Sequence, residues 1–237
     1  MKWSRTLQLV SLLLFPITIY YFSPAIIIYG ISEQVISGSF IVFGALLVTS
    51  IFTRRLFCST LCPAGAVQDI MIDINSKPIK SLKIRWSKWI IFILWIGIII
   101  YLIFEFGLNS IEPFYQTKFG ISVYEPGGYI VFYLVLGIFM LMAAIFGNRG
   151  GCHTICWMAP FMIIGQKIGD FLKLRSYKLV TTDQVCIACG RCTKSCPMSL
   201  DVEGMVLNSN VNHSECISCS KCVNACPKSV LDIRFSR

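Results

Sequence analysis

Four stretches of the chain are almost wholly apolar, with short polar segments between them. They cover residues 7–29, 35–52, 89–106 and 129–146. Each approaches the ~20 residues that a helix needs to cross the hydrocarbon core of a bilayer. The backbone must then be helical, because lipid offers it no hydrogen-bond partner. The pattern predicts four transmembrane helices, and Pro16 and Pro24 make the first of them the least regular.

The basic residues between these stretches predict an orientation. Lys and Arg precede the first stretch, follow the second, gather as five residues between positions 77 and 88 and follow the fourth stretch. Four crossings place all of these groups on one side, and the other side holds Glu33, Glu112, Glu125 and Lys118. Since basic residues favour the cytoplasmic side, we expect both termini in the cytoplasm and a multi-pass protein of the inner (cytoplasmic) membrane. The first run is too long for a signal peptide, which favours an uncleaved span.

Composition supports the membrane assignment. The 237 residues are 55% hydrophobic and only 14% charged, whereas a soluble domain has about 25% charged residues. The net charge of +9 is high enough to suggest nucleic acid, but the hydrophobicity argues against such a partner. Cytoplasmic loops account for the charge instead. The 12 cysteines then all fall on the cytoplasmic side, where metal ligation is more common than disulfides.

Eight of these cysteines form two complete runs near the C-terminus. The first run is Cys186-x2-Cys189-x2-Cys192-x3-Cys196-Pro197, and the second, from Cys216 to Pro227, has the same spacing. This is the run of bacterial ferredoxins with two [4Fe–4S] clusters, in which the fourth cysteine of each run ligates the other cluster. The expected ligands of cluster I are Cys186, Cys189, Cys192 and Cys226. Those of cluster II are Cys216, Cys219, Cys222 and Cys196.

The alternatives for these runs are a zinc ribbon and a disulfide scaffold. Zinc sites commonly use isolated CxxC pairs rather than this complete double run. Basic residues inside the runs suit anionic clusters: Arg191, Lys194, Lys221 and Lys228. Short terminal strands are expected over residues 177–181 and 230–235. A domain this small buries little apolar surface, so cluster binding must supply much of its folding free energy.

The other four cysteines form a repeated motif. Cys58-x3-Cys62-Pro63 follows the second apolar stretch, and Cys152-x3-Cys156 follows the fourth, each after an arginine. A helix-like pattern comes next in both copies. In the first copy an apolar face (Val67, Ile70, Met71, Ile74) lies opposite Gln68, Asp69 and Asp73, and in the second an apolar face (Phe161, Ile164, Ile168, Phe171) lies opposite Gln166, Lys167 and Asp170. Such helices suit the membrane surface.

The membrane part therefore resembles two copies of a hairpin, a CxxxC motif and an interfacial helix. A pseudo-twofold axis along the membrane normal would bring the four thiols together at the cytoplasmic edge. Pro63 suits the first turn of a helix, and a helix N-terminus is expected to lower a thiol pKa. The four thiols, Cys58, Cys62, Cys152 and Cys156, are candidates for a third Fe–S cluster or a copper site. The alternative is two separate pairs of buried cysteines without metal.

Other cofactors find no support in the sequence. Only two histidines occur, His153 and His213, and no histidine pair lies within the apolar stretches, so a bis-histidine haem b is excluded. No CxxCH attachment motif for haem c and no nucleotide-binding glycine motif is present. His153 is a candidate ligand or a proton-handling group near a quinone, or a packed interface residue. The tryptophans at 86, 89, 95 and 157 suit either a quinone pocket or an ordinary membrane interface.

These features together resemble the NapH/NosR-type membrane polyferredoxins. The resemblance rests on four predicted helices, the C-terminal double cysteine run, the segment FCSTLCPAGAVQD and the second CxxxC motif. It covers nearly the whole chain. It implies electron transfer between the membrane quinone pool and a redox partner subunit. One departure is that the second motif has its proline displaced to Pro160, which weakens the expectation of equal roles for the two motifs.

The sequence thus predicts an α-helical membrane module of four transmembrane helices over residues 1–175 and a small cytoplasmic α+β ferredoxin-type domain over residues 176–237. The expected function is that of a membrane-bound iron–sulfur electron-transfer subunit, such as a component of a quinol dehydrogenase rather than a stand-alone enzyme. The alternatives are an assembly factor that reduces copper with its CxxxC thiols and, with less support, a redox sensor.

Overall fold

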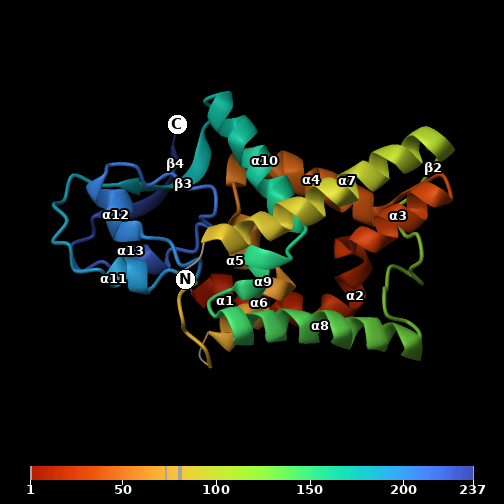
Figure 1. Ribbon diagram of the computed structural model, residues 1–237, viewed down its shortest axis with the longest axis horizontal. Coiled ribbons are helices and arrows are strands. Elements are labelled where there is room, and N and C mark those ends of the chain that lie inside the picture. Colours follow the sequence, from red (N-terminus) through yellow and green to blue (C-terminus); the bar gives the residue numbers. More distant parts are fainter. Residues whose placement is uncertain (1, 73, 80–81, 237) are drawn as a thin grey trace.

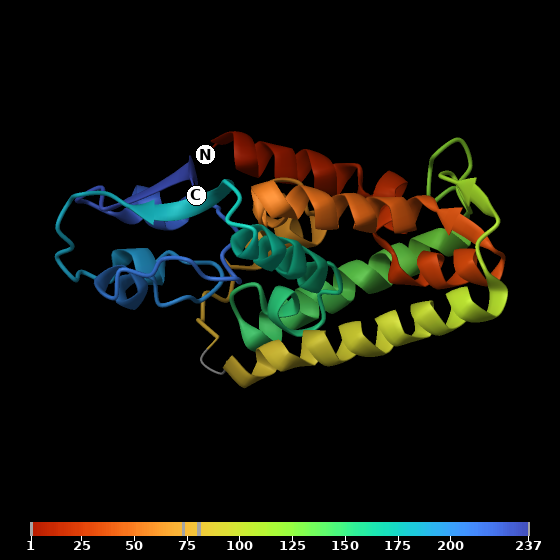
Figure 2. The same cartoon turned by 90° about the horizontal axis from the view of Figure 1, so that it is seen from above.

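A computed structural model describes residues 2–72, 74–79 and 82–236 of the chain. It has a long helical part and a small α+β part at one end of it (Figure 1). Both ends of the chain lie beside the junction of the two parts, and the opposite end of the helical part carries the short β1 and β2 strands (Figure 2). The elements of the helical part are α1 (Lys2–Leu13), α2 (Phe15–Thr18), η1 (Ile19–Phe22), α3 (Pro24–Ser32), β1 (Val35–Ser37), α4 (Gly38–Thr53), α5 (Leu56–Thr60), α6 (Pro63–Met71), η2 (Leu82–Trp86), α7 (Ser87–Phe106), β2 (Ser110–Glu112), α8 (Pro126–Phe146), α9 (Gly150–Thr154) and α10 (Met158–Phe171).

Two helices among the described residues are long and apolar enough to cross a membrane. They are the stretch Ile84–Phe106, which includes α7, and α8. Only 17% of an 18-residue apolar segment of each is buried within the protein, so most of the apolar surface of these segments faces outward, as lipid-facing helices require. The predicted third and fourth apolar stretches are therefore helices long enough to span. The helix α4 is apolar but shorter, with 16 residues.

The first apolar stretch does not form one straight helix. It is divided into α1, α2, η1 and α3, and α1 bends by 66° relative to the segment Phe15–Phe22. Pro16 lies in the first turn of α2 and Pro24 begins α3, because a proline lacks the N–H that a continuing helix would use. Counting the bent pair as one span gives up to three candidate spans. The predicted number of four crossings is not confirmed.

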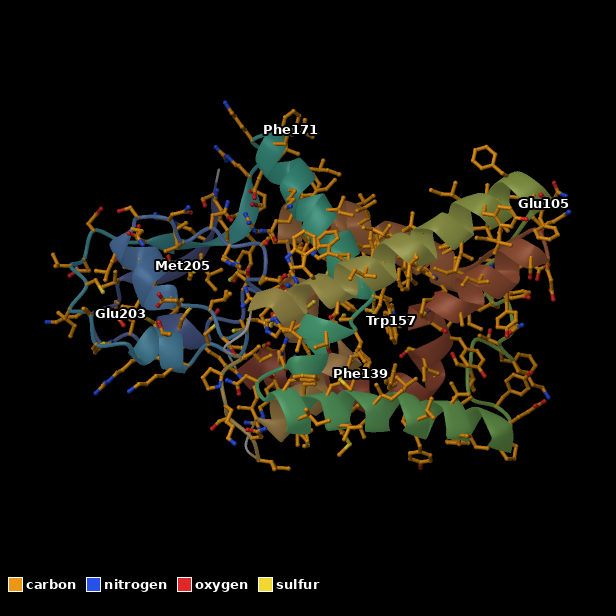
Figure 3. The ribbon with its side chains drawn as sticks, in the orientation of Figure 1. Glu105, Phe139, Trp157, Phe171, Glu203 and Met205 are labelled. Atoms are coloured by element: carbon orange, nitrogen blue, oxygen red, sulfur yellow. The ribbon has the colours of Figure 1, made fainter. Side chains whose placement is uncertain are left out.

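The helices that follow the CxxxC motifs do not separate apolar from polar side chains as predicted. After the first motif, Gln68 is 0% exposed, while Ile74 lies beyond the end of α6 and is 74% exposed. Asp73 of the predicted polar face lies outside the described residues. After the second motif, Gln166 is buried, and Phe171 at the outer end of α10 is 85% exposed (Figure 3). Each of these helices also packs against the long apolar helix that precedes the other motif. Thus α6 packs against α8, and α10 packs against α4. Both helices therefore belong to the interior of the helical part along much of their length.

Glycines allow the close contact between α10 and α4. A Cβ atom at Gly165 would overlap Ser50 Oγ and the Leu47 carbonyl oxygen, and one at Gly169 would lie 2.6 Å from the Ile51 carbonyl oxygen. Small residues four positions apart let two membrane helices approach at backbone distance. This contact sets the position of α10 and, through it, that of Cys156.

Gly165→Ala is expected to destabilise the protein by about 1–3 kcal/mol, the usual range for an overpacked site. Thermal unfolding in detergent measures the change. Gly44→Ala on α4 is the matched control, because nothing lies within 4 Å of the added methyl group there. Equal unfolding temperatures for the two variants would contradict the close contact.

The α+β part has the predicted terminal strands. The strands β3 (Ser176–Thr181) and β4 (Leu231–Ser236) pair antiparallel along their full length. The short helices between them are α11 (Arg191–Lys194), α12 (Val202–Leu207) and α13 (Lys221–Ala225). Gly190 and Ser220 precede α11 and α13 in the left-handed conformation, so the chain reverses sharply after each CxxC pair. One hydrophobic core joins Met162 of the helical part to Leu179 and Ile217 of the α+β part.

Candidate functional site

Two cavities in the α+β part are each lined by four cysteines. Those of the outer cavity, cavity I, are Cys186, Cys189, Cys192 and Cys226. Those of the inner cavity, cavity II, are Cys196, Cys216, Cys219 and Cys222. Each cavity thus takes three cysteines from one run and the fourth from the other run. The structure brings together the same two sets of four residues that the run spacing predicts.

The chemistry of these thiols fits an iron–sulfur cluster. Burial, together with the neighbouring Cys216 and Cys196, raises the pKa of Cys219 to about 11 despite the nearby Arg149. Burial and three neighbouring thiols likewise raise the pKa of Cys222. Buried thiols in such a group become thiolates only when a positive charge compensates them, and iron supplies that charge. The Val230 backbone N–H also points at Cys226 Sγ at 3.4 Å, as donors around cluster sulfurs do.

The four CxxxC thiols gather inside the helical part. Cys58 lies in α5, Cys62 precedes α6, Cys152 lies in α9 and Cys156 precedes α10. All four are buried. We define them as the thiol site. Each interacts electrostatically with others of the group, with Cys62 acted on by the other three.

The predicted lowering of the thiol pKa at a helix N-terminus is wrong for Cys62. Pro63 does begin α6, and Cys62 is its N-cap residue. Burial and the three neighbouring thiols raise the pKa of Cys62, and the Gly65 backbone N–H lowers it by less. Burial and the neighbouring Cys152 and Cys58 also raise the pKa of Cys156, to about 12. Desolvation therefore outweighs the helix terminus here.

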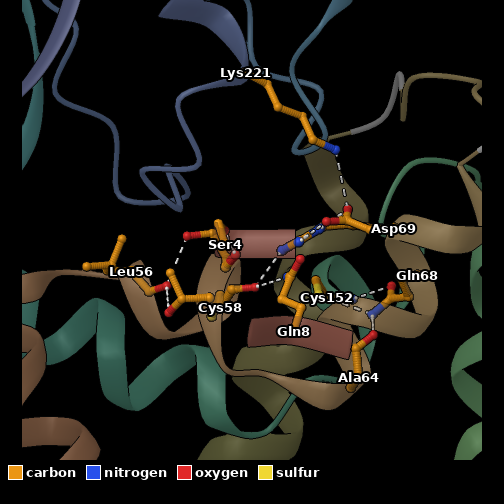
Figure 4. Close-up of polar contacts among 12 residues, drawn as sticks. Ser4, Gln8, Leu56, Cys58, Ala64, Gln68, Asp69, Cys152 and Lys221 are labelled. Atoms are coloured by element: carbon orange, nitrogen blue, oxygen red, sulfur yellow. Dashed lines mark hydrogen bonds and ion pairs between the residues drawn. The ribbon is translucent and has the colours of Figure 1, made fainter. Parts of the chain in front are cut away.

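The Gln68 side chain makes two hydrogen bonds to Cys152, one of the four thiol-site cysteines. Its side-chain Nε2 donates to Cys152 Sγ at 3.2 Å, and its Oε1 accepts from the Cys152 backbone N–H at 3.2 Å (Figure 4). Gln8 of α1 donates to the Cys58 carbonyl oxygen at 3.4 Å. The sequence pattern placed Gln68 only on a polar helix face. Its contact with the second motif depends on the packing of α6 beside α9.

Arg149 joins the two motifs and faces the α+β part. Its guanidinium donates to the Cys58 carbonyl oxygen at 3.0 Å and to both carboxylate oxygens of Asp69 at 2.8 and 2.7 Å. Lys221 of α13 lies 3.7 Å from Asp69 (Figure 4). Burial raises the pKa of Asp69, but the charge and hydrogen bonds of Arg149 outweigh it, so the pKa is lowered overall. Arg149 also acts electrostatically on Cys152 and Cys219, so it lies between the thiol site and cavity II.

A second ionic group ties the parts together beside cavity II. Glu215, the residue before Cys216, pairs with Arg55 at 2.6 Å and with Lys88 at 2.6 Å. Both cations are 0% exposed. Burial alone raises the pKa of Glu215, but Arg55 and Lys88 lower it to about 2. No local sequence signal links these three residues, since 160 positions separate Arg55 from Glu215.

His153 lies beside this ionic group. It is fully buried, and within the part of the chain that the structure describes neither ring nitrogen has a hydrogen-bond partner. Burial lowers the pKa of His153 to about 3, and the cations Arg85, Lys88 and Arg55 contribute in the same direction. The side chain is therefore neutral at physiological pH.

An apolar cavity of about 260 Å³ adjoins the thiol site. Cys62 and Cys156 line it together with residues of the broken first stretch and of α8, among them Phe15, Ile19, Tyr20, Val131, Val135 and Phe139. Phe139 and Trp157 are in ring contact there (Figure 3). Of the four tryptophans considered for a quinone pocket, Trp157 lines this cavity; Trp95 instead packs on Phe43 and Phe161. We call it the membrane cavity.

Two family models match cysteine-bearing regions of the chain. Residues 178–227 match a family model described as a 4Fe-4S dicluster domain, and residues 37–81 match one described as a 4Fe-4S binding domain. No solved structure matches the chain.

Three relatives extend the likeness over most of the chain. YccM of Escherichia coli, whose name describes an electron transport protein, is 24% identical over 76% of this chain and 52% of its own length. MJ0749 of Methanocaldococcus jannaschii is 24% identical over 85% and 74%. The regulatory protein NosR of Stutzerimonas stutzeri is 26% identical over 68% and 22%. The chain thus spans about half of the E. coli relative. With the apolar helices, these matches support iron–sulfur electron transport by a membrane protein.

Proposed function

We propose that this 4Fe–4S membrane protein of the NapH/NosR type carries electrons between a membrane redox partner, such as the quinone pool, and two [4Fe–4S] clusters. The observation that carries the proposal is the pair of cavities, each lined by four cysteines drawn from both runs. Cluster I binds to Cys186, Cys189, Cys192 and Cys226, and cluster II to Cys196, Cys216, Cys219 and Cys222. When bound, the clusters supply one-electron redox chemistry.

The protein's own residues give the two clusters different surroundings. Glu215 and Lys221 connect the loops around cavity II to the helical part, whereas Cys189 at cavity I is exposed. Cluster II is thus the one nearer the membrane, and cluster I is accessible to a partner subunit. In this proposal residues 1–175 form the membrane module with four crossings, residues 176–237 form the cluster-binding domain, and both termini lie in the cytoplasm of the inner membrane.

The membrane cavity suits a quinone. It is lined almost entirely by apolar side chains, adjoins the thiol site and borders α8, which is long enough to span the bilayer. Lipid-soluble ligands bind in such cavities, with few polar groups setting their orientation. A quinone bound there takes up two electrons and two protons to become a quinol, and the reverse step returns them.

Val135→Trp is expected to fill this cavity and to slow the exchange of electrons with a quinone. The experiment reduces the purified protein with dithionite under anaerobic conditions, adds duroquinone and follows reoxidation of the clusters by EPR. We expect roughly a tenfold lower rate, as for a site that loses about 1.4 kcal/mol of binding free energy.

Leu134→Trp is the matched control, because Leu134 lies on the same helix and is 59% exposed. Its rate is expected to equal that of the unaltered protein. No reoxidation by duroquinone in the unaltered protein would contradict the quinone partner, and equal rates in both variants would contradict the cavity as its site.

A second candidate function is copper reduction by an assembly factor. One observation favours it: Cys58 Sγ lies 3.6 Å from the thioether sulfur of Met162, and thiolate with thioether is a ligand set that selects Cu(I). Copper that co-purifies with the protein and is lost in Met162→Leu would favour this function over quinone-linked electron transfer.

A further inference from the structure

Two arginines occupy equivalent positions before the CxxxC motifs. Arg55 precedes Cys58 by three residues, and Arg149 precedes Cys152 by three residues. Both are essentially fully buried. Arg55 acts electrostatically on Cys58, Cys152 and Cys156. The repeated motif therefore supplies two thiols and one buried cation from each copy.

The guanidinium of Arg149 has hydrogen-bond acceptors at its Nε, Nη1 and Nη2 atoms, but the guanidinium of Arg55 lacks acceptors for two of its nitrogens. Its Nη1 donates to Glu215, while Nε and Nη2 are buried and have no acceptor among the residues that the structure describes. The neighbouring His153 adds one more unpaired N–H, because its neutral ring carries a single donor and neither ring nitrogen has a partner among these residues. A buried donor left unpaired costs about 1–3 kcal/mol, more when it is charged. Such a group of donors beside four thiols indicates an acceptor that belongs at the site.

The thiols themselves suggest which acceptor this is. Among the described residues no three His, Cys, Asp or Glu side chains converge as around a single metal ion. The cysteines of cavities I and II do not converge in this way either, because a cubane cluster holds its thiolates at separate corners. The four thiols of the thiol site are gathered in the same way as the cysteines of cavities I and II.

The family match also indicates a [4Fe–4S] cluster, but the matched range holds only two of the four cysteine ligands that such a cluster needs. Residues 37–81 match a model described as a 4Fe-4S binding domain, yet this range contains only Cys58 and Cys62. A cubane cluster needs four protein ligands. The structure supplies the other two from the second motif, Cys152 and Cys156, which lie against the first pair inside the helical part.

We infer that Cys58, Cys62, Cys152 and Cys156 hold a third [4Fe–4S] cluster, and that Arg55 is a positioning residue that donates hydrogen bonds to its inorganic sulfur. The site lies between the membrane cavity, which Cys62 and Cys156 line, and cavity II, toward which Arg149 and the Arg55–Glu215 pair extend. The cluster itself does not depend on the proposed quinone function. Its place as the first acceptor for electrons from the membrane cavity does.

Iron and acid-labile sulfide content of the anaerobically purified protein tests the inference. We expect about twelve irons per chain, from about four in each of three clusters. Cys62→Ser and Cys156→Ser are each expected to lower this to about eight while the EPR signals of the two ferredoxin-type clusters remain. Cys189→Ser is the reciprocal control, since it should remove cluster I and leave the signal of the third cluster.

About eight irons in the unaltered protein, or stoichiometric copper, would overturn the inference, and this measurement needs no variant to fold. Duroquinone reoxidation is independent of it: twelve irons without reoxidation would reject the quinone function alone, and eight irons with reoxidation would reject the third cluster alone.

Arg55→Lys tests the positioning role. Lysine keeps the charge that pairs with Glu215 but lacks the Nε and Nη2 donors. The iron content is expected to stay the same, while the midpoint potential of the third cluster becomes more negative, because hydrogen bonds to cluster sulfur raise the potential. An unchanged potential with unchanged iron would show that Arg55 does not face the cluster.

Discussion

Glu215→Gln is expected to destabilise the folded protein by about 3–5 kcal/mol, the range found when one partner of a buried ion pair is removed. Glutamine keeps the shape of the side chain but leaves Arg55 and Lys88 without a countercharge. Both cations are 0% exposed, so water cannot take the place of the carboxylate. The loss falls at the junction of the two parts of the molecule, directly before Cys216.

Thermal unfolding in detergent, followed by the visible absorption of the clusters, measures this effect. For a chain of this size a loss of this magnitude lowers the unfolding temperature by on the order of 10 °C. Glu112→Gln is the control, because Glu112 is exposed on β2. Equal unfolding temperatures for Glu215→Gln and Glu112→Gln would show that the ionic group does not hold the junction together.

The same carboxylate predicts a dependence of stability on pH. The pKa of Glu215 is lowered from its ordinary 4.5 to about 2. A lowered pKa means that the ionised group stabilises the fold fully above about pH 4.5 and that this contribution is lost as the pH falls toward 2. The difference corresponds to about 3 kcal/mol. Glu215→Gln should remove this part of the acid sensitivity.

Cys196→Ser is expected to remove cluster II, although Cys196 lies in the first cysteine run. Cys226→Ser is expected to remove cluster I, although it lies in the second run. Each loss takes about half of the iron bound by the α+β part. The reason is the crossed lining of the two cavities, in which the fourth cysteine of each run lies with the first three cysteines of the other run.

Matched variants make the crossing measurable. The residual EPR spectrum of Cys196→Ser should equal that of Cys222→Ser, since both leave cluster I. The spectrum of Cys226→Ser should equal that of Cys192→Ser, since both leave cluster II. A spectrum of Cys196→Ser that equals that of Cys192→Ser instead would show that each run ligates its own cluster.

Loss of a cluster should also loosen the α+β part. The strands β3 and β4 bring the two ends of this part together, and the cavities link its two cysteine runs. A part this small buries too little apolar surface to compensate for the conformational entropy of folding without its metal. Faster proteolysis after residue 176 is therefore expected in Cys196→Ser and in Cys226→Ser alike.

Several features of the fold and the site follow from the sequence because their signals are local. The cysteine runs predict two sets of ligands through the pattern of two-cluster ferredoxins, and the same sets line cavities I and II. The apolar stretches around α7 and α8 are continuous enough to define helices that can span a bilayer. The repeat of CxxxC after an arginine predicts four thiols in one place, and the structure gathers them.

The sequence could not show which side of α6 or α10 faces the protein. In water an apolar face points inward, but lipid is as apolar as a protein interior. Gln68 and Gln166 are therefore buried, where Gln68 bonds Cys152, and Phe171 is exposed. The glycine contact between α10 and α4 decides the packing, and its partners are more than a hundred residues apart.

The sequence by itself predicted the two sets of four cysteines, the two terminal strands and the apolar character of the helical part, because each signal lies in residues close together along the chain. Only the tertiary structure decided that the first apolar stretch breaks into shorter helices, that Arg55, Lys88 and Glu215 meet between the two parts, and that a cavity adjoins Cys62 and Cys156. These features depend on contacts between distant segments, where burial sets the cost of leaving a charge or a hydrogen-bond donor without a partner.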